Sequence, residues 1–181
     1  VVKGSYAVER LTVNKKFVQL SKENFARYKR ESKKLKRFWQ TATPKRFWAG
    51  KFKMPVKAKR VSGNFGRRRI LNGESRSPHS GEDFPADRGT PVYAAQRGQV
   101  VMAQDLFFSG NTVVLDHGLG LYTLYAHLNS LNTKKGDFLV RGQILGTVGS
   151  TGRVTGPHLH WSIRLNGARV NPMDLLEIVN N

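Results

Sequence analysis

The sequence predicts an all-β domain of antiparallel sheets that follows a small, basic α+β segment. Two observations lead to this fold class. From residue 61 onward, short runs of β-branched and aromatic residues alternate with glycine-rich turns, a pattern typical of consecutive antiparallel strands. Before that point the chain is rich in lysine and arginine and contains one stretch in which apolar residues recur with helical spacing.

The charge also divides the chain into two parts. The protein has 181 residues and a formal net charge of +19. Residues 1–61 contain 19 lysines and arginines and 3 acidic residues, which gives +16, whereas residues 62–181 carry +3. The connector 41–55 contains prolines and a glycine that break regular structure, so we expect a basic N-terminal segment at 1–53 and a second domain at 54–181.

Within the basic segment, residues 6–20 predict one or two short strands. Ser21 is a suitable N-cap for a helix that runs to about Gln40. Residues spaced by threes and fours form one apolar stripe along this helix: Phe25, Tyr28, Ser32, Leu35 and Trp39. Interleaved aromatic and basic residues also suit a nucleic-acid-binding arm, but we favour docking of the stripe on the neighbouring domain.

Composition limits the possible classes of protein and of site. No apolar run approaches the roughly 18 residues that a membrane span needs, so no transmembrane segment is expected. Cysteine is absent, which excludes disulfides, thiolate metal sites and a cysteine nucleophile. Any metal ligand must therefore be a His, Asp or Glu side chain.

In the second domain, six segments predict strands: 90–95, 98–103, 111–118, 121–128, 137–149 and 158–165. The segment 173–179 predicts a helical turn. In the last strand, the apolar residues Leu159, Trp161, Ile163 and Leu165 are expected to face the core. The opposite, open face then carries His158, His160, Ser162 and Arg164. Two histidines on one face of a strand, about 7 Å apart, can address a single site.

Upstream, His79 and Asp83 form an H-x-x-x-D pattern on a segment that prolines and a glycine keep from being a regular helix. Alone this pattern is weak, since a loop histidine and a solvated aspartate would look the same. Together with His160 it provides two imidazoles and a carboxylate, a ligand set that suits zinc and leaves a fourth position for water.

Two further histidines belong to strand segments. His127 ends the segment 121–128, and strict alternation places it on the same face as Leu121, Thr123 and Tyr125. His117 lies at the end of a strand that enters a glycine-rich turn, and we interpret it as structural.

Five blocks of the second domain resemble the lysostaphin/LytM-type zinc metallopeptidases in their order and spacing: PHSGEDF, GTPVYAAQRGQVV, NTVVLDHGLGLYTLYAHL, KKGDFLVRGQILGTVGSTG and GPHLHW. The resemblance extends from about Ser62 to Leu176. It implies an all-β catalytic domain of antiparallel sheets with the active site in a groove along one sheet. It also implies cleavage of peptide bonds in bacterial peptidoglycan.

The resemblance implies a role for each residue that matches the motifs of the family. His79, Asp83 and His160 would be the ligands of one Zn²⁺ per chain, and His127 and His158 the catalytic pair beside the attacking water. In the loop that enters the groove of Gram-negative members, Arg67, Arg68, Arg69 and Arg76 are candidates to bind carboxylates of the substrate, as is Arg153. Ordinary solvated arginines remain the alternative reading of these residues.

The expected function is that of a zinc-dependent endopeptidase that hydrolyses peptidoglycan crosslinks, in particular D-alanyl-meso-diaminopimelate bonds. A periplasmic, envelope-bound or secreted location is implied, with the basic first third attracted to an anionic envelope surface and not to nucleic acid. That segment is also a candidate pro-segment, in which the side chains able to cover the zinc are Glu9, Asn14, Glu23 and Asn24.

Three alternatives remain. A non-catalytic LytM-like activator of other cell-wall hydrolases would have a degenerate site, whereas all five positions are filled here. A lipoyl-type or phosphocarrier domain is suggested by the segment 134–149, which has no acceptor lysine at a hairpin tip. A basic nucleic-acid binder would leave the histidines unexplained.

Overall fold

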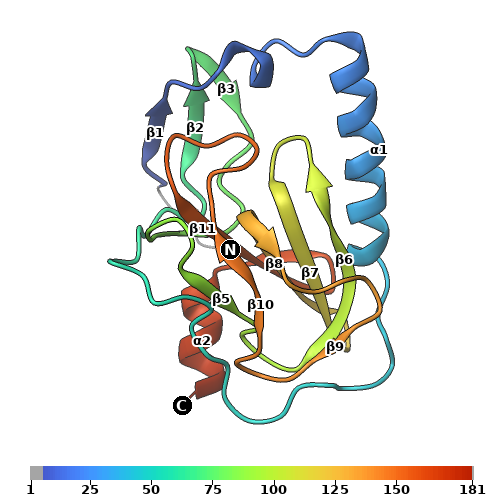
Figure 1. Ribbon diagram of the computed structural model, residues 1–181. Helices are drawn as coiled ribbons and strands as arrows, with labels where there is room; N and C mark the ends of the chain where they lie inside the picture. Colours follow the sequence, from blue (N-terminus) through green and yellow to red (C-terminus); the bar gives the residue numbers. More distant parts are fainter. Residues whose placement is uncertain (1–5, 181) are drawn as a thin grey trace.

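The computed structural model describes residues 6–180 and contains one large antiparallel sheet, a small three-stranded sheet and a long helix (Figure 1). The large sheet has the strand order β12-β11-β8-β7-β6-β9. These strands span Ala168–Val170, His158–Leu165, Leu121–Leu131, Gly110–Gly118, Gly98–Leu106 and Phe138–Leu139. Three more strands join its edges: β4 (Glu82–Pro85) pairs with β11, and β10 (Ile144–Val148) pairs with both β8 and β5 (Pro91–Tyr93). Every pairing in this sheet is antiparallel, which confirms that part of the predicted fold.

The two faces of the large sheet are both covered. On one face, Phe84, Tyr125 and Trp161 belong to the main hydrophobic core and have no exposed surface. On the other face a smaller core forms around Met102 and Val114. Alternation of side chains along the strands supplies both cores, because neighbouring residues of β8 and β11 point to opposite faces.

The predicted core face of β11 is confirmed for three of its four residues. Leu159, Trp161 and Ile163 are fully buried, whereas Leu165 is 40% exposed. Leu165 is the last residue of β11 and lies where the pairing of this strand with β8 and β12 ends. The expectation that Leu165 is a core residue was therefore wrong.

A short N-terminal strand, β1 (Val8–Leu11), forms the small sheet with β2 (Arg68–Leu71) and β3 (Glu74–Arg76). Strands β1 and β2 are parallel, and β2 and β3 are antiparallel. Residues 6–20 were predicted to form one or two strands. In place of a second strand they form a 3-10 helix, η1 (Lys15–Phe17), because the Asn14 side chain accepts the Lys16 amide hydrogen and starts a helical turn.

Helix α1 (Lys22–Trp39) has Ser21 as its N-cap and Gln40 as its C-cap, as the sequence predicts. It lies beside β6 (Figure 1), with Leu35, Phe38 and Trp39 packed against the smaller core. The first half of the predicted apolar stripe is not buried in this way, since Phe25 is 46% exposed and Tyr28 is 38% exposed.

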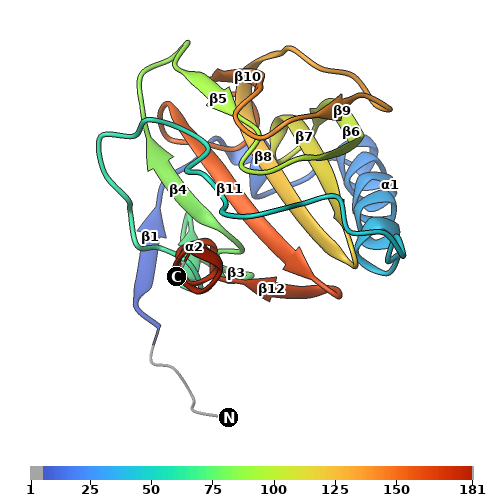
Figure 2. The same ribbon diagram turned by 90° about the horizontal axis from the view of Figure 1, so that it is seen from below.

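Residues 41–58, between α1 and β2, form an extended strap that follows one side of the large sheet (Figure 2). Its backbone bonds to the β7–β8 turn through Thr43 and Phe47, and the Gln96 side chain donates to three of its carbonyls. The expected boundary at 53/54 falls within this strap, whose Phe52 and Val56 are both 3% exposed in the main core.

Helix α2 (Pro172–Asn180) closes the chain and places Leu175 and Leu176 in the main core. Among the described residues, neither helix combines the length and the apolar character needed to cross a membrane.

Candidate functional site

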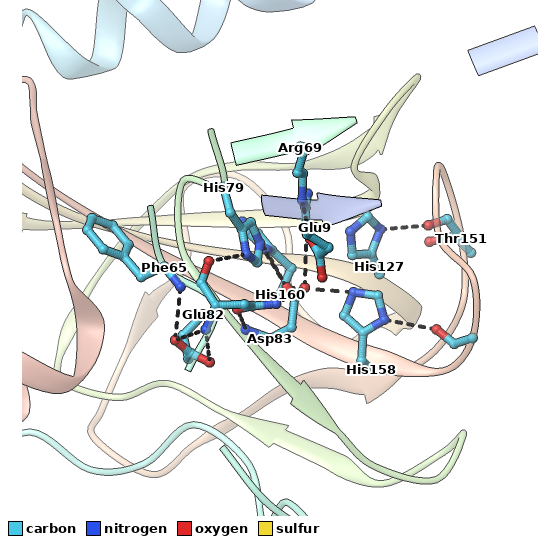
Figure 3. A network of polar contacts seen from close by, with 12 residues as sticks. Glu9, Phe65, Arg69, His79, Glu82, Asp83, His127, Thr151, His158 and His160 are labelled. Carbon is cyan, nitrogen blue, oxygen red and sulfur yellow. Dashed lines mark hydrogen bonds and ion pairs between the residues drawn. The ribbon is translucent and has the colours of Figure 1, made fainter. Parts of the chain in front are cut away.

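Three predicted metal ligands meet where β4 pairs with β11 (Figure 3). Asp83 in β4 is the register partner of His160 in β11, and His79 lies in the turn just before β4. Gly81 makes this turn possible, because a Cβ atom at that position would lie 2.3 Å from the carbonyl oxygen of Trp161. The H-x-x-x-D pattern therefore brings both residues to one point only because its central residue is small.

The ligand atoms form a tight triangle. His79 Nε2 lies 2.8 Å from His160 Nδ1 and 3.1 Å from Asp83 Oδ1, and His160 Nδ1 lies 2.7 Å from the same oxygen. A tetrahedral zinc centre with N and O ligands has its ligand atoms about 3.3 Å apart. Two imidazole nitrogens and a carboxylate oxygen thus converge almost at the separation that such an ion requires, and the donor set fits it.

Outer contacts fix the orientation of two of these ligands. Nδ1 of His79 donates to the Asn64 carbonyl (3.2 Å), which leaves the Nε2 lone pair directed at the cluster. The second oxygen of Asp83 accepts from the Asn64 amide (2.9 Å) and from Arg69 (3.3 Å). Arg69 in turn donates to Glu9 of β1 (3.0 Å), so the N-terminal strand is linked to the site.

Glu82 supports the loop that carries Asn64. Its side chain is 1% exposed, and its carboxylate accepts the backbone amide hydrogens of Asn64 (3.2 Å) and Phe65 (3.4 Å). Sequence reasoning missed Glu82 and Asn64, and it considered Arg69 only as a candidate for substrate binding. Glu82 could have been found from the sequence. It directly precedes Asp83 and therefore falls on the core face of the strand, where a carboxylate needs hydrogen-bond donors.

His127 reaches the site through an irregularity in β8. Strict alternation would turn it toward the main core, where Tyr125 and then Leu128 point. Between these two residues the pairing with β7 shifts its register, and His127 adopts a left-handed backbone with φ +63°. The prediction that His127 shares a face with Leu121, Thr123 and Tyr125 was therefore wrong; the bulge turns its ring to the opposite face.

The predicted catalytic pair lies together beside the cluster. The ring centroids of His127 and His158 are 4.9 Å apart, and His127 is 6.0 Å from the ring of His160. Nδ1 of His127 donates to the Thr151 carbonyl (2.8 Å), and Nδ1 of His158 donates to the Gly156 carbonyl (2.9 Å). Each ring therefore has its Nε2 lone pair available, and that of His158 is 3.7 Å from Asp83 Oδ1.

The electrostatics favour neutral His127 and His160 rings beside an ionised Asp83. Burial lowers the pKa of His127 well below its usual value, and the neighbouring His158 and His160 add to this effect. Burial also lowers the pKa of His160 to about 4. Burial opposes ionisation of Asp83, but its contacts with the His160 and His79 rings outweigh this effect and hold its pKa well below the usual value.

Two cavities open on either side of the cluster, and His127 and His160 line both. Cavity A has a volume of about 290 Å³ and lies toward Glu9, Arg60, Pro85 and Pro157. Cavity B has a volume of about 250 Å³ and lies toward α1, with Trp39, Ser80, Arg164 and Arg169 in its wall. The cluster thus lies in the middle of a groove with two arms.

The arginines predicted to bind substrate occupy different places. Arg153 lines both cavities, and its guanidinium stacks on the ring of Phe108 at 4.4 Å. Arg76 lies further along, in an adjoining hollow that it shares with Arg153. Arg68 is exposed and lies outside the residues that line either cavity, since β2 turns its neighbour Arg69 toward the site instead.

His117 is remote from this groove. It is fully buried, its Nδ1 donates to the Arg97 carbonyl (2.8 Å), and its Nε2 is 2.7 Å from the Thr123 hydroxyl. These contacts support the structural role expected for it.

The curated relatives that the chain matches include two enzymes of Gram-negative bacteria. It is 46% identical over 121 residues to "Peptidoglycan DD-endopeptidase ShyA" of Vibrio cholerae, covering 66% of this chain and 28% of the relative. It is 41% identical over 122 residues to "DD-carboxypeptidase/endopeptidase Mpg" of Neisseria meningitidis, covering 67% and 28%. The chain therefore spans less than a third of the length of these relatives.

Solved structures with the same fold extend the likeness. A putative peptidase M23 of Pseudomonas aeruginosa superposes with a TM-score of 0.77 at 36% identity, over 90% of this chain and 65% of that one. The catalytic domain of lysostaphin from Staphylococcus simulans gives a TM-score of 0.58 at 34% identity, over 65% and 92%. In sequence, residues 77–172 match Peptidase family M23. This match covers more than half of the sequence, and the chain belongs to peptidase family M23.

Proposed function

We propose that this chain is a zinc-dependent endopeptidase that hydrolyses peptide crosslinks of bacterial peptidoglycan. The observation that carries the proposal is the convergence of His79, Asp83 and His160 within 4.8 Å of one another, with two more imidazoles beside them. The family match and the names of the relatives support it.

His79, Asp83 and His160 would hold the zinc ion. A bound zinc ion supplies a Lewis acid that polarises a carbonyl and lowers the pKa of a coordinated water toward neutrality. Arg69 and Asn64 keep one oxygen of Asp83 occupied, so the other oxygen stays directed at the metal position. This arrangement selects one rotamer of the carboxylate before metal arrives.

His127 and His158 would move protons. Each presents Nε2 to the groove because its Nδ1 donates to a backbone carbonyl. One ring accepts a proton from the attacking water, and a proton then passes to the nitrogen of the leaving amine as the C–N bond breaks. The low pKa of His127 keeps this ring neutral and able to accept a proton at neutral pH.

For the bond that is cleaved, we propose the D-alanyl-meso-diaminopimelate crosslink. The support comes from the names of the two relatives, both of which are described as DD-acting enzymes of Gram-negative bacteria. A place in the cell envelope follows from this substrate. The charge of +16 in residues 1–61 would then attract the protein to anionic envelope polymers.

The second candidate function is a non-catalytic activator of other cell-wall hydrolases. Such a protein does not need a complete metal site, whereas here three potential ligand atoms lie together with two further imidazoles beside them, in a groove that is open on both sides. The same experiment separates the two functions.

The test measures zinc by elemental analysis and the release of soluble muropeptides from purified Gram-negative sacculi, with and without a chelator. We expect about one zinc per chain and chelator-sensitive release of uncrosslinked peptides. His160→Ala should lose the metal, whereas His158→Ala should keep it and lose turnover by a factor of roughly 10²–10⁴. Zinc without release would favour the activator, and protein without zinc would contradict the proposal.

A further inference from the structure

Cavity B carries a cluster of arginines with no acidic counterpart. Its wall contains Arg69, Arg153, Arg164 and Arg169, and no Asp or Glu is among the described residues that line it. Of the four, Arg69 is neutralised from the other side by Glu9 and Asp83. Cavity A differs, because those two carboxylates belong to its own wall.

The three remaining guanidinium groups are oriented without being neutralised. Arg153 stacks on Phe108 (4.4 Å) and Arg164 on Trp39 of α1 (5.6 Å). Arg164 also donates to the Gly167 carbonyl (3.2 Å), and Arg169 donates to the Pro78 carbonyl (3.4 Å). Aromatic faces and neutral carbonyls hold these side chains in place but leave their charge uncompensated.

Mutual repulsion among these groups is part of the arrangement. Burial and the charges of Arg69 and Arg76 lower the pKa of Arg153 to about 10, and burial and Arg169 lower that of Arg164 to about 10. All of them remain protonated at neutral pH. A protein that gathers like charges beside its reaction centre gains most from an anionic ligand, because the anion removes both the repulsion and the desolvation cost.

The position of the cluster indicates which part of a substrate it would contact. Arg164 lies on the same face of β11 as His160, about 13 Å further along the strand, and the side chains of both line cavity B. A substrate that crosses the metal centre must place one half in cavity A and the other in cavity B. In the crosslink proposed above, the amino acid that leaves with the free amine bears a carboxylate on the carbon next to the scissile nitrogen.

We propose that cavity B binds the leaving half of the crosslink and that its arginines recognise the carboxylate next to the leaving amine. Arg153 lines both cavities beside His127, while Arg164 and Arg169 extend the positive wall away from it. This inference rests on the proposed endopeptidase activity. It adds the direction in which the substrate lies across the metal site, with its leaving half in cavity B. It also adds a requirement for a free carboxylate next to the leaving amine.

The test uses two synthetic crosslinked dimers that differ only at this carboxylate, one free and one converted to the amide. For the unsubstituted protein we expect kcat/KM to be at least roughly tenfold higher for the free carboxylate, the size expected for a charge-assisted hydrogen bond. The variant Arg164→Gln/Arg169→Gln should lose most of this preference and keep its zinc. Arg88→Gln/Arg141→Gln, which changes two exposed arginines outside both cavities, is the charge-matched control and should keep the preference.

The outcomes are distinct. If the unsubstituted protein cleaves both dimers equally well, the carboxylate is not recognised and the inference is overturned while the endopeptidase remains. An equal loss of activity of the double variant on both dimers would show that Arg164 and Arg169 have a structural role, which also overturns it. If neither dimer is cleaved by zinc-loaded protein, the proposed function is wrong and the inference falls with it. Where the double variant fails to fold, Arg169→Gln, which changes an exposed side chain, replaces it under the same criteria.

Discussion

At the scale of single residues, His127 combines a functional side chain with an unfavourable backbone. Its φ of +63° lies in the left-handed region, which L-residues other than glycine occupy at a cost. That conformation is what takes the ring out of the main core and places it 4.9 Å from His158. The position therefore trades stability for the placement of an imidazole.

Two substitutions at this position separate the backbone from the ring. Both His127→Gly and His127→Ala remove the imidazole and should reduce hydrolysis to a similar low level. The glycine variant should be more stable than the alanine variant by about 1 kcal/mol, since only alanine carries a Cβ into the left-handed region. Denaturant unfolding of the two zinc-loaded variants measures this difference, and equal stability would contradict the role given to the backbone.

His117 predicts a dependence of stability on pH. Burial lowers its pKa to about 4, against an ordinary value of 6.5, so the unfolded chain takes up the proton first as the pH falls. The free energy of unfolding should be largest above about pH 6.5 and should decrease as the pH falls toward 4. The variant His117→Gln removes this titration, and its stability should show a shallower pH dependence than that of the unsubstituted protein in parallel urea series. Identical slopes would exclude the contribution of His117.

Residue types and spacings were enough to predict the ligands and the catalytic pair as candidates. His79, Asp83 and His160 followed from their chemistry, and His158 from the two-residue period of a strand. The orientation of His127 could not be predicted, because it depends on a register shift against a different strand. Asn64 was missed, and Arg69 was considered only for substrate binding, because their contacts with Asp83 join residues 19 and 14 positions apart.

At the scale of elements, the strap 41–58 behaves as part of the sheet assembly. Gly118 at the end of β7 shows how closely the strap packs against the sheet, since a Cβ atom at this position would be 1.7 Å from the Lys45 carbonyl oxygen. Gly136 has a similar backbone, with φ +99° against +88° for Gly118, but open space around it. The two glycines therefore differ in packing and share a conformational preference.

Gly118→Ala should destabilise the protein by several kcal/mol, because the strap must move away from the β7–β8 turn. Gly136→Ala should cost about 1 kcal/mol, from backbone strain alone. Thermal unfolding of both variants checks the comparison. Similar losses for the two would show that the strap accommodates the added methyl group easily.

Local signals determined how well each element could be predicted. Helix α1 was expected almost residue by residue, because Ser21 marks its start and the apolar spacing continues for the whole length. The 3-10 helix η1 was open to interpretation as a strand, since three residues leave no periodicity to detect. Strand β1 was expected, but its partner β2 lies 60 residues away and could not be inferred.

At the scale of the whole molecule, the positive charge of residues 1–61 predicts how binding to the cell envelope should depend on salt. If its charge attracts the protein to anionic polymers, binding to sacculi should fall steeply as salt rises, because salt screens charges at the surface. The triple variant of exposed α1 residues, Lys33→Gln/Lys36→Gln/Arg37→Gln, should bind more weakly at low salt. Lys134→Gln/Lys135→Gln/Arg141→Gln, which removes the same charge elsewhere, should have little effect.

Pelleting of the protein with sacculi across a salt series measures this binding. Equal weakening by the two triple variants would mean that net charge matters and its location does not. The sequence made the charge asymmetry visible by counting alone. It did not show that α1 and the β1–β3 sheet form walls of the groove, because those walls depend on long-range packing.

The pairing of β4 with β11 has a consequence for how the protein matures. Asp83 and His160 are 77 positions apart, so a chain that emerges from its N-terminus displays two metal-binding side chains long before the third exists. Strands β5 to β10 lie between β4 and β11 in the sequence, so the site closes through a long-range pairing. A chain in which β11 has not yet formed therefore lacks the third side chain of the cluster, and the candidate metal site is assembled only when β11 pairs with β4.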